Sequence, residues 1–196
     1  MMKILFVILS VFLFSITLYG QKCKNFKDEI DPFTSKKIII SRGFSLSGID
    51  IMNTQPTISG EFVFENDSIY FKLNSSMIFS NGGLSSATVN SKDMVDIKTN
   101  DYIIFKFEGN DKVVKLTPIQ SSGSFEKVVL GNTYIQSNSK YKITKEELMP
   151  FVFNKVERIR ISKNNENNYF DYSLKSIEKK ENVIFSSKCF LTALEK

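Results

Sequence analysis

The sequence contains no histidine, and this absence excludes several catalytic chemistries at once. Ser-His-Asp and Cys-His catalysis both need an imidazole base, so neither can operate within this chain. Zinc sites that contain histidine are excluded too, and two cysteines alone cannot form a four-cysteine site. We therefore expect a non-catalytic protein with no metal and no cofactor.

Two short segments look like known sites but lack a residue that those sites need. Residues 43–48 (GFSLSG) are similar to a nucleophile elbow, yet Ser47 stands where the second glycine belongs. Asp28, Glu29 and Asp31 crowd together before Pro32 without the alternating spacing and glycine of a calcium loop. We interpret the first segment as a turn. We interpret the second, within residues 22–37, as a solvated lead-in.

The charge of the chain is modest and evenly spread. The formal net charge is +5, carried mainly by lysine. Such an excess favours solubility and a weak attraction to anionic surfaces. Nucleic-acid binding would instead require a clustered basic stripe. We therefore expect no nucleic-acid partner.

The first 20 residues have the layout of a secretory signal peptide. Lys3 precedes an apolar run, and Gly20 supplies a small residue at the expected cleavage site. The alternative is a membrane anchor, but the run is short for a spanning helix. Lys22 before Cys23 disfavours a lipid-modified cysteine. We predict export to the periplasm or beyond, no membrane span after cleavage, and a single domain over residues 21–196.

The only two cysteines, Cys23 and Cys189, are candidates for a disulfide. Export favours their oxidation. A bridge between them would close nearly the whole domain and remove unfolded-state entropy worth about 5 kcal/mol. The alternative is two independent thiols.

The clearest structural signal is a hairpin over residues 60–73 (GEFVFENDSIYFKL). Asn66 and Asp67 tolerate the positive φ angles of a two-residue turn. With these two at the tip, Phe64 faces Ile69, Phe62 faces Phe71, and Glu61 faces Lys72. This alternation predicts one buried and one solvated face. The residues on the expected inner face are Phe62, Phe64, Ile69, Phe71 and Leu73.

Residues 102–116 (YIIFKFEGNDKVVKL) predict a second hairpin of the same kind. With Asn110 and Asp111 at its tip, Phe107 faces Val114 and Phe105 faces Leu116. The same register sets Lys106 opposite Lys115. The residues on the expected inner face are Ile103, Phe105, Phe107, Val114 and Leu116. The likeness of the two hairpins indicates either an internal duplication or two similar local solutions.

Further strands are expected at 37–42, 77–79, 87–89, 94–97, 125–130, 132–135, 156–161 and 169–174, with residues 164–168 as a loop. In the strand at 156–161, Val156, Arg158 and Arg160 share one face. The two arginines predict either an anion contact or a solvated outer face.

Two helices are expected late in the chain. Thr144 and Glu147 form a capping box that starts a short helix ending near Val152. Ser173 or Ser176 starts the last helix. The expected stripe on that helix consists of Ile177, Ile184, Phe185, Cys189 and Leu191.

The opening KDEIDPFTSKK, the segment 144–161 and the closing Cys-bearing helix resemble a group of small secreted proteins from Bacteroidota-type bacteria. The matching residues are Asp31, Phe33, Thr34, Lys36, Val156, Ile159, Arg160 and Ile161. Ser35 replaces a glycine of that pattern. The resemblance covers most of the mature chain. It implies a periplasmic or secreted address and carries no known activity or site.

Together these patterns predict an α+β fold, with a mostly antiparallel and curled sheet of about eight to ten short strands. A lipocalin-like barrel has a similar order of elements, but its Gly-x-Trp opening is missing because the chain has no tryptophan. We expect a non-catalytic envelope protein that binds a protein or a surface polymer. The alternatives are a carrier of a small apolar ligand inside the sheet and a hydrolase that uses carboxylates alone.

Overall fold

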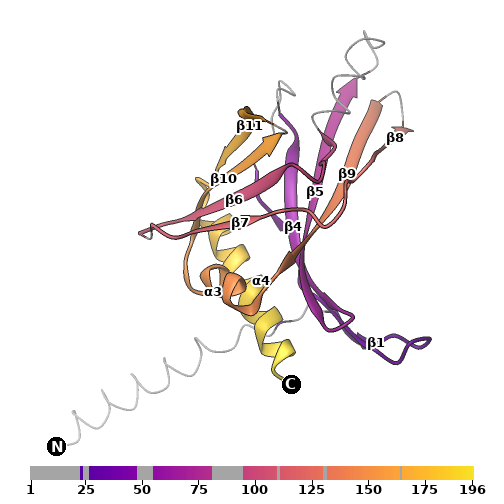
Figure 1. Cartoon of the computed structure of the whole chain (residues 1–196), viewed down its shortest axis with the longest axis vertical. Coiled ribbons are helices and arrows are strands. Elements are labelled where there is room, and N and C mark those ends of the chain that lie inside the picture. Colours follow the sequence, from indigo (N-terminus) through magenta and orange to yellow (C-terminus); the bar gives the residue numbers. More distant parts are fainter. Residues whose placement is uncertain are drawn as a thin grey trace, which may run out of the picture.

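A computed structural model gives the structure of residue 23 and of residues 27–47, 55–80, 95–109, 111–129, 132–163 and 165–196. These residues form two antiparallel sheets and two helices (Figure 1). The seven-stranded sheet contains β1 (Lys27–Ile30), β2 (Lys37–Ile40), β3 (Phe44–Ser45), β4 (Thr57–Glu65), β5 (Ser68–Ser80), β8 (Ser124–Val129) and β9 (Asn132–Ile143). The four-stranded sheet contains β6 (Tyr102–Phe107), β7 (Val113–Leu116), β10 (Val156–Lys163) and β11 (Asn165–Ser173). The helices are α3 (Lys145–Phe153) and α4 (Ile177–Leu194).

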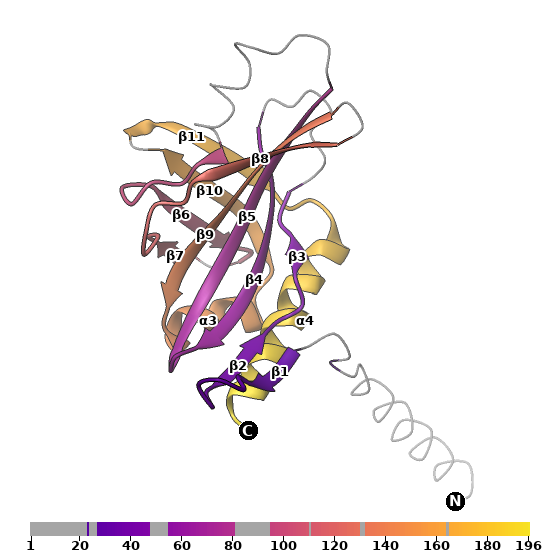
Figure 2. The same cartoon turned by 90° about the vertical axis from the view of Figure 1, so that its right-hand side faces the viewer.

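The larger sheet curls strongly into a half-barrel, with the order β1-β2-β4-β5-β9-β8 and with β3 added beside β4. The helices lie to one side of β4 and β5, as Figure 1 shows. Figure 2 shows β4, β5 and β9 from the outside of the curl. The expected fold class, a curled antiparallel sheet with a short helix and a C-terminal helix, is confirmed. The described residues form eleven strands, slightly more than expected.

The first hairpin has the predicted register at every named pair. Phe64 faces Ile69, Phe62 faces Phe71, and Glu61 faces Lys72. Asn66 and Asp67 have φ angles of 50° and 56°, so both occupy the left-handed region that this turn requires. The hairpin continues beyond the predicted residues to the pair Thr57–Ser76, and β5 also pairs with β9 from Ile69 to Ser80.

The second hairpin has the predicted inner face but a different register. All five expected inner residues are buried, yet Phe105 faces Val114 and Ile103 faces Leu116. The predicted pairs Phe107–Val114 and Phe105–Leu116 are therefore wrong, and so is the Lys106–Lys115 pair. Gly109 has a φ of +64° and turns the chain before Asp111. A shift by two residues preserves the inner face because side chains alternate with a period of two.

The prediction that Val156 shares a face with Arg158 and Arg160 is wrong, because β10 contains a bulge. The pairing with β6 shifts between Val156 and Arg158, so Val156 turns inward and is fully buried together with Ile159. The extra residue of a bulge changes the alternation, which a regular strand pattern cannot anticipate. Arg158 and Arg160 remain on the outer face, as predicted.

The predicted stripe of α4 is correct for Cys189, which is buried, but not for the helix as a whole. Ser176 caps the helix and is one of its two expected starts. Ile177 is exposed, and Ile184, Phe185 and Leu191 are only partly buried. The residues that the helix does bury are Val183, Ser186, Ser187, Cys189, Phe190 and Ala193. Two serines interrupt the apolar pattern on the true inner face. The hydroxyl of Ser187 is satisfied within the helix by donating to the carbonyl of Val183.

Several element boundaries differ from those expected. Residues 27–30 of the expected solvated lead-in are exposed but form the strand β1, and β9 runs on to Ile143. β11 begins at Asn165, inside the expected loop, while residues 95–97 lie outside the strands. The strand expected at 87–89 lies outside the described residues. α3 ends at Phe153, close to the prediction, and Thr144 and Glu147 form both hydrogen bonds of the capping box.

Phenylalanine rings from both sheets and both helices meet inside the curl. The ring of Phe151 on α3 has its centroid 5.4 Å from Phe62, 4.9 Å from Phe105 and 5.1 Å from Phe107. Phe190 on α4 approaches Phe62 at 5.7 Å. All five side chains are fully buried. The concave face is therefore packed with aromatic side chains in this region.

The predicted disulfide between Cys23 and Cys189 is present. It joins the start of the domain to the buried side of α4 across 166 residues. The Cα atoms lie 5.8 Å apart, within the range that a disulfide requires. The bridge thereby encloses both sheets in one covalent loop.

We predict that Gly60→Ala destabilises the protein by about 1–3 kcal/mol. A Cβ at this position would lie 2.6 Å from two ring atoms of Phe71, which is fully buried and cannot move aside. Gly123→Ala is the matched control, since a Cβ there meets no atom within 4 Å. Urea unfolding measures both. Equal midpoints for the two variants would contradict the close packing at Gly60.

We predict that Cys23→Ala/Cys189→Ala lowers the free energy of unfolding by about 2–5 kcal/mol, because the unfolded chain regains its entropy. Guanidinium titration with and without reductant measures the change. Reduction should lower the stability of the wild type by a similar amount and leave the variant unaffected. A reductant effect of equal size in both proteins would argue against the bridge.

Candidate functional site

A hollow lies on the outer face of β4, β5 and β9. Two cross-strand rows of uncharged polar side chains line it, one row running Thr57–Ser76–Gln136 and the other Ser59–Asn74–Asn138. The hollow has a volume of about 300 Å³. We call these six side chains the polar rows.

Strand alternation explains why the polar rows gather on one face. Their neighbours Ile58, Ser75 and Ser137 point inward and are buried, so every second residue of each strand points outward. Five of the six outward residues are partly buried, and Asn138 is exposed. Amide and hydroxyl groups both donate and accept hydrogen bonds. The hollow therefore presents a dense, uncharged set of hydrogen-bonding groups.

A second hollow of about 240 Å³ continues this surface toward β8. It shares Gln136 with the first hollow and adds Tyr134, Lys127 and Val129. Beside it, Phe125 is 49% exposed and lies across from Gln136 in the β8–β9 pairing. The polar rows thus merge into a surface that carries aromatic side chains.

Lys127 lines the second hollow, and most other charged residues of this outer face lie toward the β4–β5 turn, from the row next to the polar rows onward. Glu61 and Lys72 face each other there, and Lys140 forms an ion pair with Glu65. The ammonium group of Lys140 also lies 3.8 Å from the centroid of the Tyr70 ring. On β4, β5 and β9, the outer face consequently has a charged half near the β4–β5 turn and an uncharged half at the polar rows.

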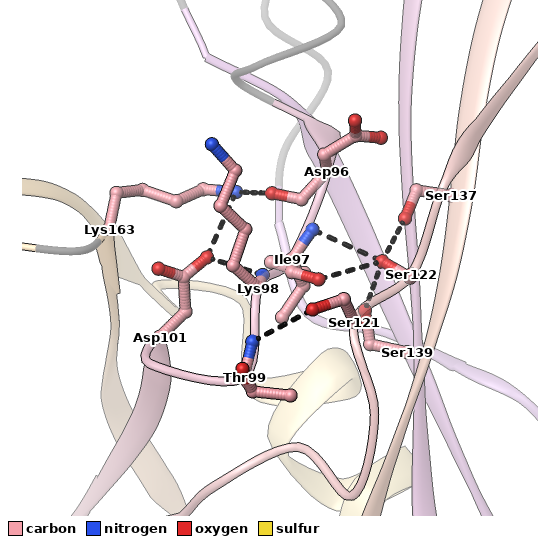
Figure 3. A network of polar contacts seen from close by, with 10 residues as sticks. All are labelled: Asp96, Ile97, Lys98, Thr99, Asp101, Ser121, Ser122, Ser137, Ser139 and Lys163. Carbon is pink, nitrogen blue, oxygen red and sulfur yellow. Dashed lines mark hydrogen bonds and ion pairs between the residues drawn. The ribbon is translucent and has the colours of Figure 1, made fainter.

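A second group of polar residues, some buried and some exposed, lies at the junction of the two sheets (Figure 3). The hydroxyl of Ser122 lies 2.7 Å from that of Ser137 and 3.1 Å from that of Ser139, both on β9. It also accepts a hydrogen bond of 3.1 Å from the backbone N–H of Ile97. The backbone of Thr99 donates in turn to the hydroxyl of Ser121. These bonds attach residues 97–99 to the loop before β8.

Lys163 and Asp101 form a buried ion pair in the same region (Figure 3). The ammonium and carboxylate groups are 3.8 Å apart, and the ammonium also donates to the backbone carbonyl of Asp96. The carboxylate of Asp101 accepts from the backbone N–H of Lys98 at 2.8 Å. Because each charge has polar partners, the pair positions the segment before β6 without leaving an isolated charge.

Tyr141 is the unusual member of this interior region. Its side chain is fully buried, and its hydroxyl forms no hydrogen bond with the described residues. Burial raises the pKa of this hydroxyl above its ordinary value, and the charge of Asp101 raises it further. The nearby hydroxyl of Ser139 partly offsets the rise. A buried phenol with a raised pKa stays neutral at physiological pH, so Tyr141 holds its proton too firmly to serve as a base.

The candidate residues of the sequence analysis do not converge on one site, and most have a structural partner of their own. Cys23 and Cys189 are consumed in the disulfide. The carboxylate of Asp31 accepts hydrogen bonds from the backbone of Phe33 and Thr34, and the bond from Phe33 is the main cause that lowers its pKa. Asp31 therefore stabilises the β1–β2 turn.

Ser45 and Ser47 likewise have structural partners. The hydroxyl of Ser45 donates to the carbonyl of Ser47. The hydroxyl of Ser47 accepts from the backbone of Ile58 at 2.8 Å. These bonds hold residues 45–47 against β4, as expected for a structural turn.

Arg160 does contact a carboxylate, but one from its own sheet. Its guanidinium donates two hydrogen bonds of 2.7 Å to Asp171 on β11. These bonds are the main cause that lowers the pKa of Asp171 and raises that of Arg160. Arg158 points to the same side.

The polar rows were not identified from the sequence. The sequence predicts no strand over residues 57–59, and residues 136–138 lie beyond the end of the strand expected at 132–135. The available signal was the recurrence of Ser, Thr, Asn and Gln at alternate positions. Without knowledge of the cross-strand register, that recurrence cannot be assembled into a surface.

Among the described residues, no three potential metal ligands of the His, Cys, Asp or Glu type converge on one point. Neither described helix combines the length and the apolar character needed to cross a bilayer. Comparisons of the chain with protein-family models, with curated proteins and with solved structures find no match.

We predict that Tyr141→Phe is neutral or stabilising at pH 7, because it removes a buried hydroxyl that forms no hydrogen bond with the part of the chain that the structure describes. The wild type should lose stability above about pH 10, where the unfolded tyrosine releases its proton and the folded one does not. This alkaline loss should be smaller in the variant. Thermal unfolding from pH 7 to 11 measures both effects.

Tyr172→Phe is the matched control for this substitution. The hydroxyl of Tyr172 is buried too, but it donates to the carbonyl of Pro56 at 2.9 Å. Its removal should cost about 1 kcal/mol at pH 7. If Tyr141→Phe were equally costly, the hydroxyl of Tyr141 would have a stabilising partner.

Proposed function

We propose that this protein is an exported, non-catalytic module that binds an uncharged glycan through the polar rows. The observation that carries the proposal is the uncharged hollow of about 300 Å³ on the outer face of β4, β5 and β9. Sugar hydroxyls both donate and accept hydrogen bonds, as do the side chains of Asn74, Asn138 and Gln136. The second hollow, which adjoins the first at Gln136, lengthens the surface so that several units of a polymer can lie along it.

The aromatic side chains beside the polar rows support a sugar more than a protein partner. Protein interfaces usually have an apolar core that a polar rim surrounds. Here the centre is polar and the apolar groups, Tyr134 and Phe125, lie at one end. An aromatic ring at the end of a hydrogen-bonding groove offers the C–H face of a sugar ring a stacking surface.

An extracellular or periplasmic location accords with this role. The signal-like residues 1–20 and the resemblance to small secreted bacterial proteins both favour export. The Cys23–Cys189 disulfide is typical of proteins from an oxidising compartment. Envelope polysaccharides would be accessible to the protein in that location.

The two alternatives receive less support from the described residues. A carrier of a small apolar ligand needs an open concave face, but Phe62, Phe105 and Phe151 pack together there. A hydrolase that uses carboxylates needs two of them across a cleft. The residues that line the two hollows include no aspartate or glutamate.

We predict that Asn74→Ala/Asn138→Ala weakens binding to a neutral glycan by about tenfold or more. Each lost hydrogen bond contributes about 1 kcal/mol, and each side chain forms at least one. A panel of neutral glucans, mannans and xylans, tested first by retention in affinity gels, identifies the strongest ligand. Isothermal titration with its oligosaccharide then gives the dissociation constants.

The matched control is Lys72→Gln/Lys142→Gln, which alters the charged half of the same outer face. It should bind the glycan as the wild type does, in low and high salt alike. Failure of the wild type to bind any neutral glycan in the panel would overturn the proposed function. Equal loss in the control variant would move the site away from the polar rows.

A further inference from the structure

The outer face of the four-stranded sheet carries charged and aromatic side chains, whereas the polar rows are uncharged. Four cationic side chains and two tyrosines gather on it. They are Arg158 and Arg160 on β10, Lys106 and Tyr102 on β6, Lys115 on β7, and Tyr169 on β11. We call these six residues the basic face.

Strand register places the cations of the basic face in two neighbouring rows. Arg158 lies opposite Lys106 in one row. Arg160 lies opposite Ile104, which in turn lies opposite Lys115, in the next row. Rows two residues apart along a strand are separated by about 7 Å. The cations therefore form a repeated array instead of a single cluster.

The carboxylates on this side satisfy only part of the array. Asp171 binds Arg160, and Glu157 lies 3.6 Å from Lys106. Arg158 and Lys115 have no ion pair with the described residues, and Arg158 is exposed. Both side chains are exposed, and the charge of Arg158 contributes only weakly to lowering the pKa of Asp171.

The two tyrosines of the basic face orient two of its cations, Lys115 and Arg160. The ammonium of Lys115 lies 3.9 Å from the ring centroid of Tyr102, and the guanidinium of Arg160 lies 4.1 Å from that of Tyr169. Such contacts restrict the long side chains to positions above the sheet. Lys115 and Arg160 therefore lose less side-chain conformational entropy when a ligand binds.

We propose that the basic face binds an acidic polysaccharide, one that carries carboxylate groups along its length. Asp171 shows that this surface can hold a carboxylate with two parallel hydrogen bonds from one guanidinium. Arg158, two residues from Arg160 on the same strand, presents a second guanidinium to a carboxylate from outside. Repeated acidic groups match the two rows of cations better than an isolated anion does.

A lipid surface fits the basic face less well. Membrane-surface binding combines basic residues with apolar side chains that enter the bilayer. Here the exposed large side chains are Val113 and Tyr169, 54% and 45% exposed, and they belong to different edge strands. The basic face is thus mainly polar. It is also separate from the polar rows, so this proposal does not depend on the proposed function.

Binding of the full mature protein to sodium polygalacturonate tests the proposal. We expect measurable binding by biolayer interferometry in 50 mM salt and a loss of at least tenfold in 300 mM salt, because counterions are released on binding. Arg158→Gln/Lys115→Gln should bind at least tenfold more weakly in 50 mM salt and depend less steeply on salt. Both substitutions affect exposed side chains, and unfolding midpoints verify the folded state.

Two further variants separate this site from general charge and from the polar rows. Lys72→Gln/Lys142→Gln removes the same charge from the other sheet and should bind nearly as well as the wild type. Asn74→Ala/Asn138→Ala should also retain binding to polygalacturonate. Equal loss in the lysine control, absence of binding in the wild type, or binding only to phosphatidylglycerol vesicles would each overturn the proposal.

Discussion

The packing of Phe151 inside the curled sheet is the interaction on which the rest of the structure depends. Its ring lies within about 5.4 Å of Phe62 from the larger sheet and of Phe105 and Phe107 from the smaller one. One side chain of a nine-residue helix thereby joins both sheets. Because aromatic pairs gain energy beyond their buried area, loss of this ring would loosen the contact between the sheets as well as the core.

This arrangement turns the apolar sides of both sheets inward and leaves their outer sides to solvent. The two outer faces then differ in chemistry. The larger sheet presents the polar rows, which are uncharged, and the smaller sheet presents the basic face. A protein with a filled interior and two chemically distinct outer faces is suited to binding at its surface. The two proposals together describe a module that contacts a neutral glycan and an acidic one on different sides.

The disulfide lies next to this core, because Cys189 precedes Phe190, whose ring packs 5.7 Å from that of Phe62. Cys189 lies on the buried side of α4, and Cys23 precedes the first strand, so the bridge connects the beginning of the domain to its last helix. The buried pair of Lys163 and Asp101 holds the segment before β6 at the junction of the sheets. Covalent and aromatic contacts thus meet at α4, and an ionic contact stabilises the junction of the sheets.

The sequence by itself determined the features that depend on local physics. Asn66 and Asp67 specified the first hairpin, and the alternation of residues 102–116 specified the inner face of the second one. Thr144 and Glu147 specified the start of α3. The fold class followed from these patterns. The register of the second hairpin, the inward turn of Val156 and the buried stripe of α4 did not, because each is selected by partners distant in the chain.

The two candidate binding surfaces depend on tertiary structure for the same reason. The polar rows combine side chains of β4, β5 and β9. Asn74 on β5 and Asn138 on β9 are neighbours, although more than sixty residues separate them in the sequence. Single-strand patterns identify which residues point outward, as they did for Arg158 and Arg160. Only cross-strand pairing decides which outward residues become neighbours, and a surface for binding exists only once they do.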